Sequence, residues 1–238
     1  MRTFLMSSAM ALTCVVAAGA AGAATLVLDG YTSAVQTVNV ASSPVPDTPS
    51  SVGATGFNMT DTATTESFVA WCLDISHYLM STGSSQDYGT TTDPYSNSYA
   101  LTATAIDRVQ AVFDANYATL DFNDADQAAA FQMALWEAAY EDDGNALSVD
   151  SGLFAASSSG STDLANTYLA NAEAYAGPEV WNVSFLEVEG YGPDRAQNTG
   201  QNLVTVSAVP LPAAGLLLLT GLVGGAALSR RRRKAAEV

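Results

Sequence analysis

The spacing of apolar residues predicts strands near both ends of the central part of the chain. Apolar and polar residues roughly alternate in two early stretches, and strand character returns in two late ones. The four stretches are 25–29, 34–40, 180–188 and 203–209. The mostly apolar run 67–79 predicts one further, buried strand, whereas the polar stretch that follows it, through about Asn97, predicts an irregular connection.

Three helices are predicted between these groups of strands. Over 103–117, apolar residues recur at helical spacing and form one stripe. The segment 124–140 begins at Asp124 or Asp126, either of which can cap exposed amides, and a third helix is expected over 162–176, ended by Gly177 and Pro178. We therefore expect an α+β fold: a single β-rich domain with a helical insertion, spanning residues 25–208.

The first 24 residues have the pattern of a secretory signal peptide. Arg2 precedes an apolar run over 9–18, and small residues close the segment at 21–23. We therefore expect signal peptidase to remove 1–24 and the domain to be exported. The alternative is an N-terminal membrane anchor, for which the apolar run is short.

The other end, 209–234, combines a proline motif, an apolar stretch and a basic cluster. The motif is Val209, Pro210, Leu211, Pro212 and Ala213, and the cluster is Arg230, Arg231, Arg232, Arg233 and Lys234. The uncharged residues between them, within 214–229, are just long enough to cross a bilayer as a transmembrane helix, with the cluster retained in the cytoplasm.

Together these residues closely resemble the VPLPA form of the PEP-CTERM sorting tail of Gram-negative bacteria. The resemblance implies that an exosortase, a membrane transpeptidase-like enzyme, recognises the motif and removes the tail. The protein would then occupy the inner membrane transiently, through 214–229, and pass to the cell surface, extracellular matrix or biofilm. The alternative is a permanent single-span anchor, which also leaves the domain outside.

The part of the chain expected to be exported is more acidic than the chain as a whole. The chain has 24 Asp and Glu against 8 Lys and Arg, a formal net charge of -16. Most cations belong to the tail, so that residues 25–209 keep only Arg108 and Arg195, lack lysine and carry a charge of about -21. Nucleic acid is therefore excluded as a partner, because its binding proteins use cations to displace counterions from phosphates.

Two residues of this acidic domain are candidates for chemistry. After signal removal Cys72 is the only cysteine, so no intramolecular disulfide can form. Gln132 lies in the helix 124–140 between apolar neighbours, and this position predicts that its side chain points towards the buried side. A buried primary amide is costly unless it has hydrogen-bond partners or is consumed chemically.

This pair resembles the internal thioester domains of Gram-positive surface adhesins. Those domains combine a cysteine after an aromatic or aliphatic residue, matched by Trp71 and Cys72, with a glutamine motif, matched by Phe131, Gln132, Leu135 and Trp136. The resemblance implies that the Cys72 sulfur attacks the Gln132 side-chain carbonyl and expels ammonia. The thioester would then couple to a polysaccharide or to another surface amine or hydroxyl.

The chemistry of a thioester is consistent with these residues. Trp71, Phe131, Leu135 and Trp136 would keep water from the bond, which forms without a cofactor and later yields its acyl group to a nucleophile. The protein is then not an enzyme beyond its own autocatalytic step. The alternative is a noncovalent structural or biofilm matrix protein in which Cys72 is a buried core residue and Gln132 a satisfied core amide.

The remaining candidates favour structural roles. On an extended strand the spacing of five residues places Cys72 and His77 on opposite faces, which argues against a Cys-His hydrolase. The segment 121–126 lacks calcium-loop ligands in register and favours helix capping, and 141–145 favours a solvated turn over a weak calcium site. We expect no metal and no cofactor.

Overall fold

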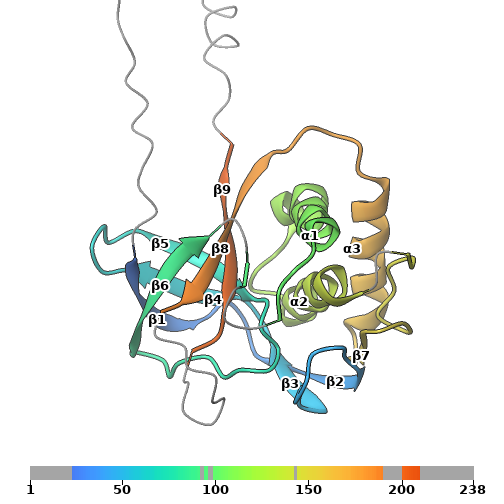
Figure 1. Cartoon of the computed structure of the whole chain (residues 1–238), viewed down its shortest axis with the longest axis horizontal. Helices are drawn as coiled ribbons and strands as arrows, with labels where there is room; N and C mark the ends of the chain where they lie inside the picture. Colours follow the sequence, from blue (N-terminus) through green and yellow to red (C-terminus); the bar gives the residue numbers. More distant parts are fainter. Residues whose placement is uncertain (1–22, 92–93, 96–98, 142–143, 190–199, 210–238) are drawn as a thin grey trace, which may run out of the picture.

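The structure is a computed structural model that describes residues 23–91, 94–95, 99–141, 144–189 and 200–209. Six strands close into an antiparallel barrel in the order β1-β4-β5-β9-β8-β6, and a second sheet has the order β3-β2-β7 (Figure 1). The strands are β1 (Ala24–Tyr31), β2 (Gln36–Ser42), β3 (Ser51–Ala54), β4 (Phe57–Asp61), β5 (Ser67–Cys72), β6 (Ser85–Thr91), β7 (Ala155–Ser157), β8 (Trp181–Val188) and β9 (Leu203–Ala208). The predicted β-rich single domain is therefore confirmed.

The helices form the predicted insertion, between β6 and β8. They are α1 (Ala103–Asn116), the short 3₁₀ helix η1 (Tyr117–Thr119), α2 (Ala125–Tyr140) and α3 (Thr162–Ala174). In Figure 1 the three α-helices stand together beside the barrel. Helix α2 contacts α1, α3, β2 and β3, so that almost its whole length from Ala128 to Tyr140 is buried. The helix is thus enclosed on all sides rather than half exposed.

Local sequence explains where α2 begins. The carboxylate of Asp124 accepts hydrogen bonds from the backbone amides of Asp126 and Gln127, which lack partners inside the helix. The capping role predicted for this segment is therefore confirmed. Helix α3 ends at Ala174, two residues earlier than predicted.

Several strand predictions were wrong. The apolar run 67–79 is a strand only as far as Cys72, and its remainder is an irregular segment whose apolar side chains Leu73 and Ile75 are buried in the core. The polar stretch after it contains β6, which was predicted as a connection. β6 is polar because backbone pairing with β1 and β8, rather than apolar side chains, holds it in the barrel.

The sequence analysis also missed β3, β4 and β7. β3 and β7 have four and three residues, too few for a period-two pattern to stand out. In β4, Phe57 and Met59 are buried at alternate positions, and their spacing is a signal that the analysis overlooked.

Both predicted targeting segments lie outside the described residues, apart from Val209 and the end of the signal peptide. Val209 is partly exposed, and its amide donates a hydrogen bond to Val180 O just beyond β9. Among the described residues, no helix is both long and apolar enough to cross a bilayer.

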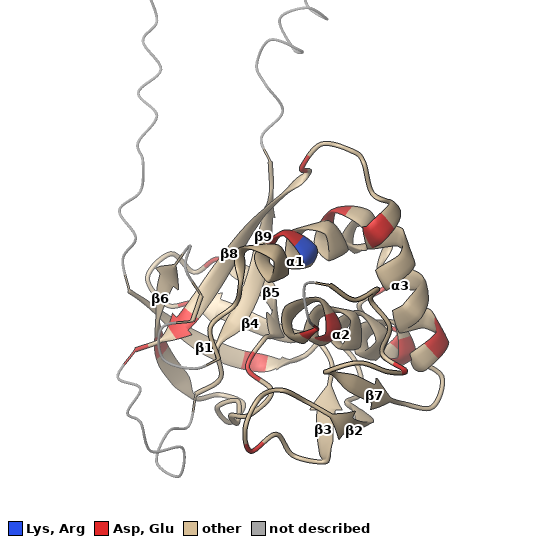
Figure 2. Ribbon diagram, turned by 45° about the vertical axis from the view of Figure 1, so that its right-hand side comes forward, with Lys and Arg blue, Asp and Glu red and all other residues tan. Residues whose placement is uncertain are grey.

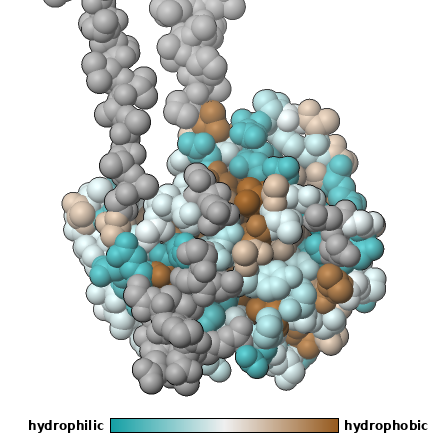
Figure 3. Space-filling view, viewed as in Figure 1, coloured by the Kyte–Doolittle hydropathy of each residue, from teal (hydrophilic) through white to brown (hydrophobic). Residues whose placement is uncertain are grey.

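Acidic residues are spread over the barrel and the helices, and the described cation, Arg108, lies on α1 (Figure 2). Arg108 donates to the backbone oxygens of Glu141 and Asn145. On the face drawn in Figure 3, apolar residues form separate patches among polar ones.

Candidate functional site: the Cys72–Gln132 pair

The fold brings Cys72 and Gln132 together, although they are 60 positions apart in the chain. Cys72 is the last residue of β5, where its backbone pairs with Leu203 of β9. Gln132 lies in the middle of α2. Both side chains are buried, Cys72 at 2% and Gln132 at 0% exposure, so that the predicted inward direction of Gln132 is confirmed.

Two hydrogen bonds join the side-chain amide of Gln132 to the backbone of Cys72. The Cys72 amide donates to Gln132 Oε1 at 2.9 Å, and Gln132 Nε2 donates to the Cys72 carbonyl oxygen at 2.6 Å. The Gln132 side-chain amide thus pairs with the Cys72 backbone much as the backbone of a neighbouring strand would. Both its oxygen and its nitrogen have hydrogen-bond partners. The donor on its oxygen also draws electrons from the side-chain carbonyl and makes that carbon more electrophilic.

The sulfur of Cys72 lies in a dry environment. Burial, the largest cause, and the negative charge of Asp74 together raise the pKa of the Cys72 thiol far above its ordinary value. The nearby Trp136 indole and Asp74 backbone amide lower this pKa by a smaller amount. Trp136 Nε1 has no partner at hydrogen-bonding distance and angle, so the indole contact is a weak one, and the group is a thiol at neutral pH.

All four residues predicted to shield the bond are in the core. Trp71, Phe131 and Leu135 have 0% exposure and Trp136 has 1%. The rings of Trp71 and Phe131 meet edge to face, with centroids 4.8 Å apart. Trp136 packs on the other side, against Phe154 at 6.4 Å. The predicted shielding residues therefore contribute apolar side chains of β5 and α2 to the core, while their shielding role remains a prediction.

Buried tyrosines that the sequence analysis missed fix the chain around Cys72. The Tyr140 hydroxyl donates to Leu73 O and accepts from the Ile75 amide, and so holds the segment after β5. Tyr95 donates to Leu203 O, opposite Cys72 on β9. Burial raises the pKa of both tyrosines, and Cys72 adds to each shift.

A sequence signal existed for Tyr140 but not for Tyr95. Tyr140 follows Gln132 by two helical turns and Trp136 by one, so all three lie on one face of α2. Tyr95 lies in a polar stretch that the sequence analysis predicted as a connection.

His77 lies in the irregular segment after β5, which overturns the argument made from strand spacing. Because β5 ends at Cys72, the alternation of faces does not extend to His77. The His77 side chain is buried, with Nδ1 at 2.6 Å from Asp74 Oδ2 and at 3.2 Å from Ser76 Oγ. His77 therefore occupies a position in the core.

His77 and Trp136 both line a cavity of about 320 Å³. Its other walls come from the end of β1, the start of β3 and the loop after β5, and include Tyr31, Val35, Ser51, Thr55, Phe57, Ile75, Tyr78 and Gln201. Gln201 Nε2 donates to the backbone oxygens of Asp74 and His77, and so ties this loop to the residues before β9. The cavity thus reaches α2 at Trp136, one helical turn beyond Gln132, and the loop after β5 at residues that follow Cys72.

The predicted solvated turn after α2 was wrong at Glu141. This side chain is buried, and its carboxylate accepts from the amides of Leu153 and Phe154 and from Asn145 Nδ2. It thus ties the end of α2 to the segment before β7. Within the described ranges, no three or more His, Cys, Asp or Glu residues group in a way that could hold a metal ion.

Comparisons with known proteins give little beyond this geometry. No protein family model and no curated protein match the chain. Among solved structures, the chain is similar to the N-terminal domain of the Streptococcus pyogenes pilus tip adhesin Cpa, at 14% identity and a TM-score of 0.38, over 77% of this chain and 96% of that one. A similarity of this size does not establish a shared function, and none is transferred.

Proposed function

We propose that this protein is an exported surface or matrix protein that attaches covalently to its target through an internal thioester between Cys72 and Gln132. The observation that carries the proposal is the pair of hydrogen bonds that holds the Gln132 amide on the backbone of Cys72. Two chemically complementary groups, a thiol and a carboxamide, are thus kept together in a water-poor core.

The bond-forming step is balanced without a cofactor. The Cys72 sulfur attacks Gln132 Cδ, the carbon–nitrogen bond breaks, and the thiol proton leaves on the departing ammonia. The Cys72 backbone amide stabilises the negative charge that develops on Gln132 Oε1 during the attack. Burial also protects the product, because water has little access to Cys72 and Gln132.

The proposed route to the surface rests on the terminal segments of the sequence. Signal peptidase removes residues 1–24, and an exosortase-type enzyme recognises 209–213 and removes the rest of the tail. The strand β9 ends at Ala208, immediately before this motif, so cleavage there leaves the barrel complete. The acyl group is then presented outside the cell to an amine or hydroxyl.

Intact mass of the purified exported protein tests the thioester. We expect the protein to be lighter than its sequence by one ammonia, and the variants Cys72→Ala and Gln132→Glu to have their full calculated masses. Gln127→Glu is the matched control, because it changes an amide on the same helix but away from Cys72, and it should keep the mass loss. A hydrolysed bond would leave glutamate at position 132 in peptide maps of the wild type. Full mass with an intact glutamine at 132 and a thiol that titrates on unfolding would overturn the proposal.

The second candidate is a noncovalent matrix protein in which Gln132 is a structural core amide. The observation in its favour is that the same two hydrogen bonds already satisfy the buried amide without any reaction. The mass measurement separates the two candidates, since only the first loses ammonia.

A further inference from the structure

The cavity beside the Cys72–Gln132 pair has the position of an acceptor site. Its volume of about 320 Å³ lies at the small end of the range of ligand pockets. Trp136 forms part of its wall and follows Gln132 by one turn on the same face of α2. A molecule in this cavity would therefore contact the side chain next to Gln132 on that helix face.

A histidine–carboxylate pair lies in the wall of the same cavity. His77 Nδ1 is 2.6 Å from Asp74 Oδ2, and this contact favours the imidazole tautomer that carries its proton on Nδ1, so that Nε2 is the acceptor nitrogen. Asp74 follows Cys72 by two residues at the start of the same loop. The loop after β5 thus connects the base to the reacting sulfur within five residues of chain.

We propose that this cavity binds a primary amine and that His77 takes the proton which the amine loses as it attacks the thioester. The inference rests on the proposed thioester and adds the acceptor site and its base. The amine nitrogen attacks Gln132 Cδ, the carbon–sulfur bond breaks, and the proton passes from nitrogen through His77 to the leaving sulfur. The products are an amide at Gln132 and a free Cys72 thiol, so that no further reactant is needed.

Charge and the cavity mouth both favour an amine on an uncharged or cationic chain. Among the residues that the structure describes, no Lys or Arg lines the cavity, and the carboxylate of Asp74 contacts His77 Nδ1. The mouth carries two exposed aromatic side chains, Tyr31 at 45% and Tyr78 at 77% exposure. Aromatic faces attract alkylammonium groups, whereas the acidic domain repels anions.

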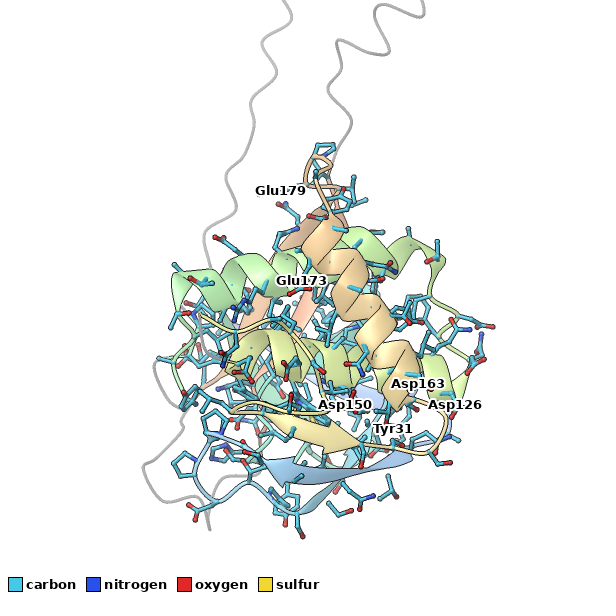
Figure 4. The ribbon with its side chains drawn as sticks, turned by 90° about the vertical axis from the view of Figure 1, so that its right-hand side faces the viewer. Tyr31, Asp126, Asp150, Asp163, Glu173 and Glu179 are labelled. Atoms are coloured by element: carbon cyan, nitrogen blue, oxygen red, sulfur yellow. The ribbon has the colours of Figure 1, made fainter. Side chains whose placement is uncertain are left out.

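Capture of a biotin-linked alkylamine by the purified exported protein tests this inference. In His77→Gln we expect the ammonia loss to remain but capture to slow by about 100-fold, the usual effect of losing a general base. Asp74→Asn should slow capture less, because it only disturbs the tautomer of His77. Asp163→Asn on α3, on the helical side drawn in Figure 4, is its matched control and should react at the wild-type rate.

Variants that narrow the cavity test the acceptor site without changing His77. Val35 lines the cavity and is 49% exposed, so Val35→Trp places a bulky ring at its mouth and should slow capture several-fold. Val180→Trp, at a 40% exposed position that does not line the cavity, should not. An alkylamine probe that carries a carboxylate should be captured more slowly than its neutral counterpart.

The outcomes separate this inference from the proposed function. If the wild type shows no ammonia loss, the thioester fails and the acceptor site fails with it. If the wild type shows the loss but His77→Gln and Val35→Trp capture the amine at its rate, only the acceptor site is overturned. Should His77→Gln not fold, Asp74→Asn and Val35→Trp decide the question.

Discussion

Opening the proposed thioester with methylamine would remove a covalent link between β5 and α2 while changing no other residue. The product carries an N-methyl amide at position 132. Its oxygen can still accept from the Cys72 amide and its single N–H can still donate to the Cys72 carbonyl, as the glutamine amide does. Because the hydrogen bonds are kept, the change in stability reports mainly the loss of the cross-link.

The size of that change follows from the length of the closed loop. Cys72 and Gln132 are 60 residues apart, and the chain-entropy relation used for disulfides gives about 4 kcal/mol for a loop of this length. For a domain of this size, each kcal/mol shifts Tm by about 2–4 °C, so we expect opening to lower Tm by roughly 10 °C. The added methyl group acts in the same direction, since the site is fully buried.

Differential scanning calorimetry before and after methylamine treatment measures this shift, with intact mass confirming that the adduct has formed. The same treatment of Cys72→Ala should leave its Tm unchanged, because that variant has no bond to open. An adduct confirmed by mass with an unchanged Tm would refute the loop-entropy reasoning, while leaving the thioester itself in place.

Three further predictions concern the surroundings of the pair. Burial raises the pKa of Glu137 to about 8, above its unfolded value of 4.5, so the folded state binds a proton that the unfolded state has lost. The free energy of unfolding should therefore fall as pH rises from about 5 to 8. Glu137→Gln, which keeps an acceptor for the Ser148 amide, should make the free energy of unfolding less dependent on pH in urea titrations. Asp124→Ala removes the cap of α2 and should cost about 1 kcal/mol in chemical denaturation, whereas Asp124→Asn should cost much less. Trp71→Ala empties a fully buried site against Phe131 and should cost about 3–5 kcal/mol, with a matching fall in Tm.

The sequence predicted the helical half of the fold better than the barrel. The helices 103–117 and 124–140 were found nearly to the residue, because apolar spacing and a capping aspartate are local signals. β6 escaped prediction because its place in the barrel depends on pairing with β1 and β8, which are distant in sequence. Strand pairing of this kind leaves no mark in a polar segment.

The candidate site could likewise be predicted only where its signals are local in the sequence. Cys72 and Gln132 stood out because a lone cysteine and a glutamine on an apolar helix face are unusual by themselves. The end of β5 at Cys72 could not be predicted, since the apolar residues after it, Leu73 and Ile75, are buried by the core and not by a strand partner. That early end is what turns the chain so that His77 and Trp136 meet at one cavity.

The absence of lysine from residues 25–209 bears on how such a site could work in a crowded matrix. An acyl group that reacts with primary amines is a hazard to neighbouring copies of the same protein if their surfaces carry lysine. Residues 25–209 offer neighbouring copies no lysine side chain, and their charge of about -21 makes copies repel one another. Under the proposed function, the composition would direct the reaction towards other molecules, while the cavity beside Trp136 would select amines small enough to reach the bond.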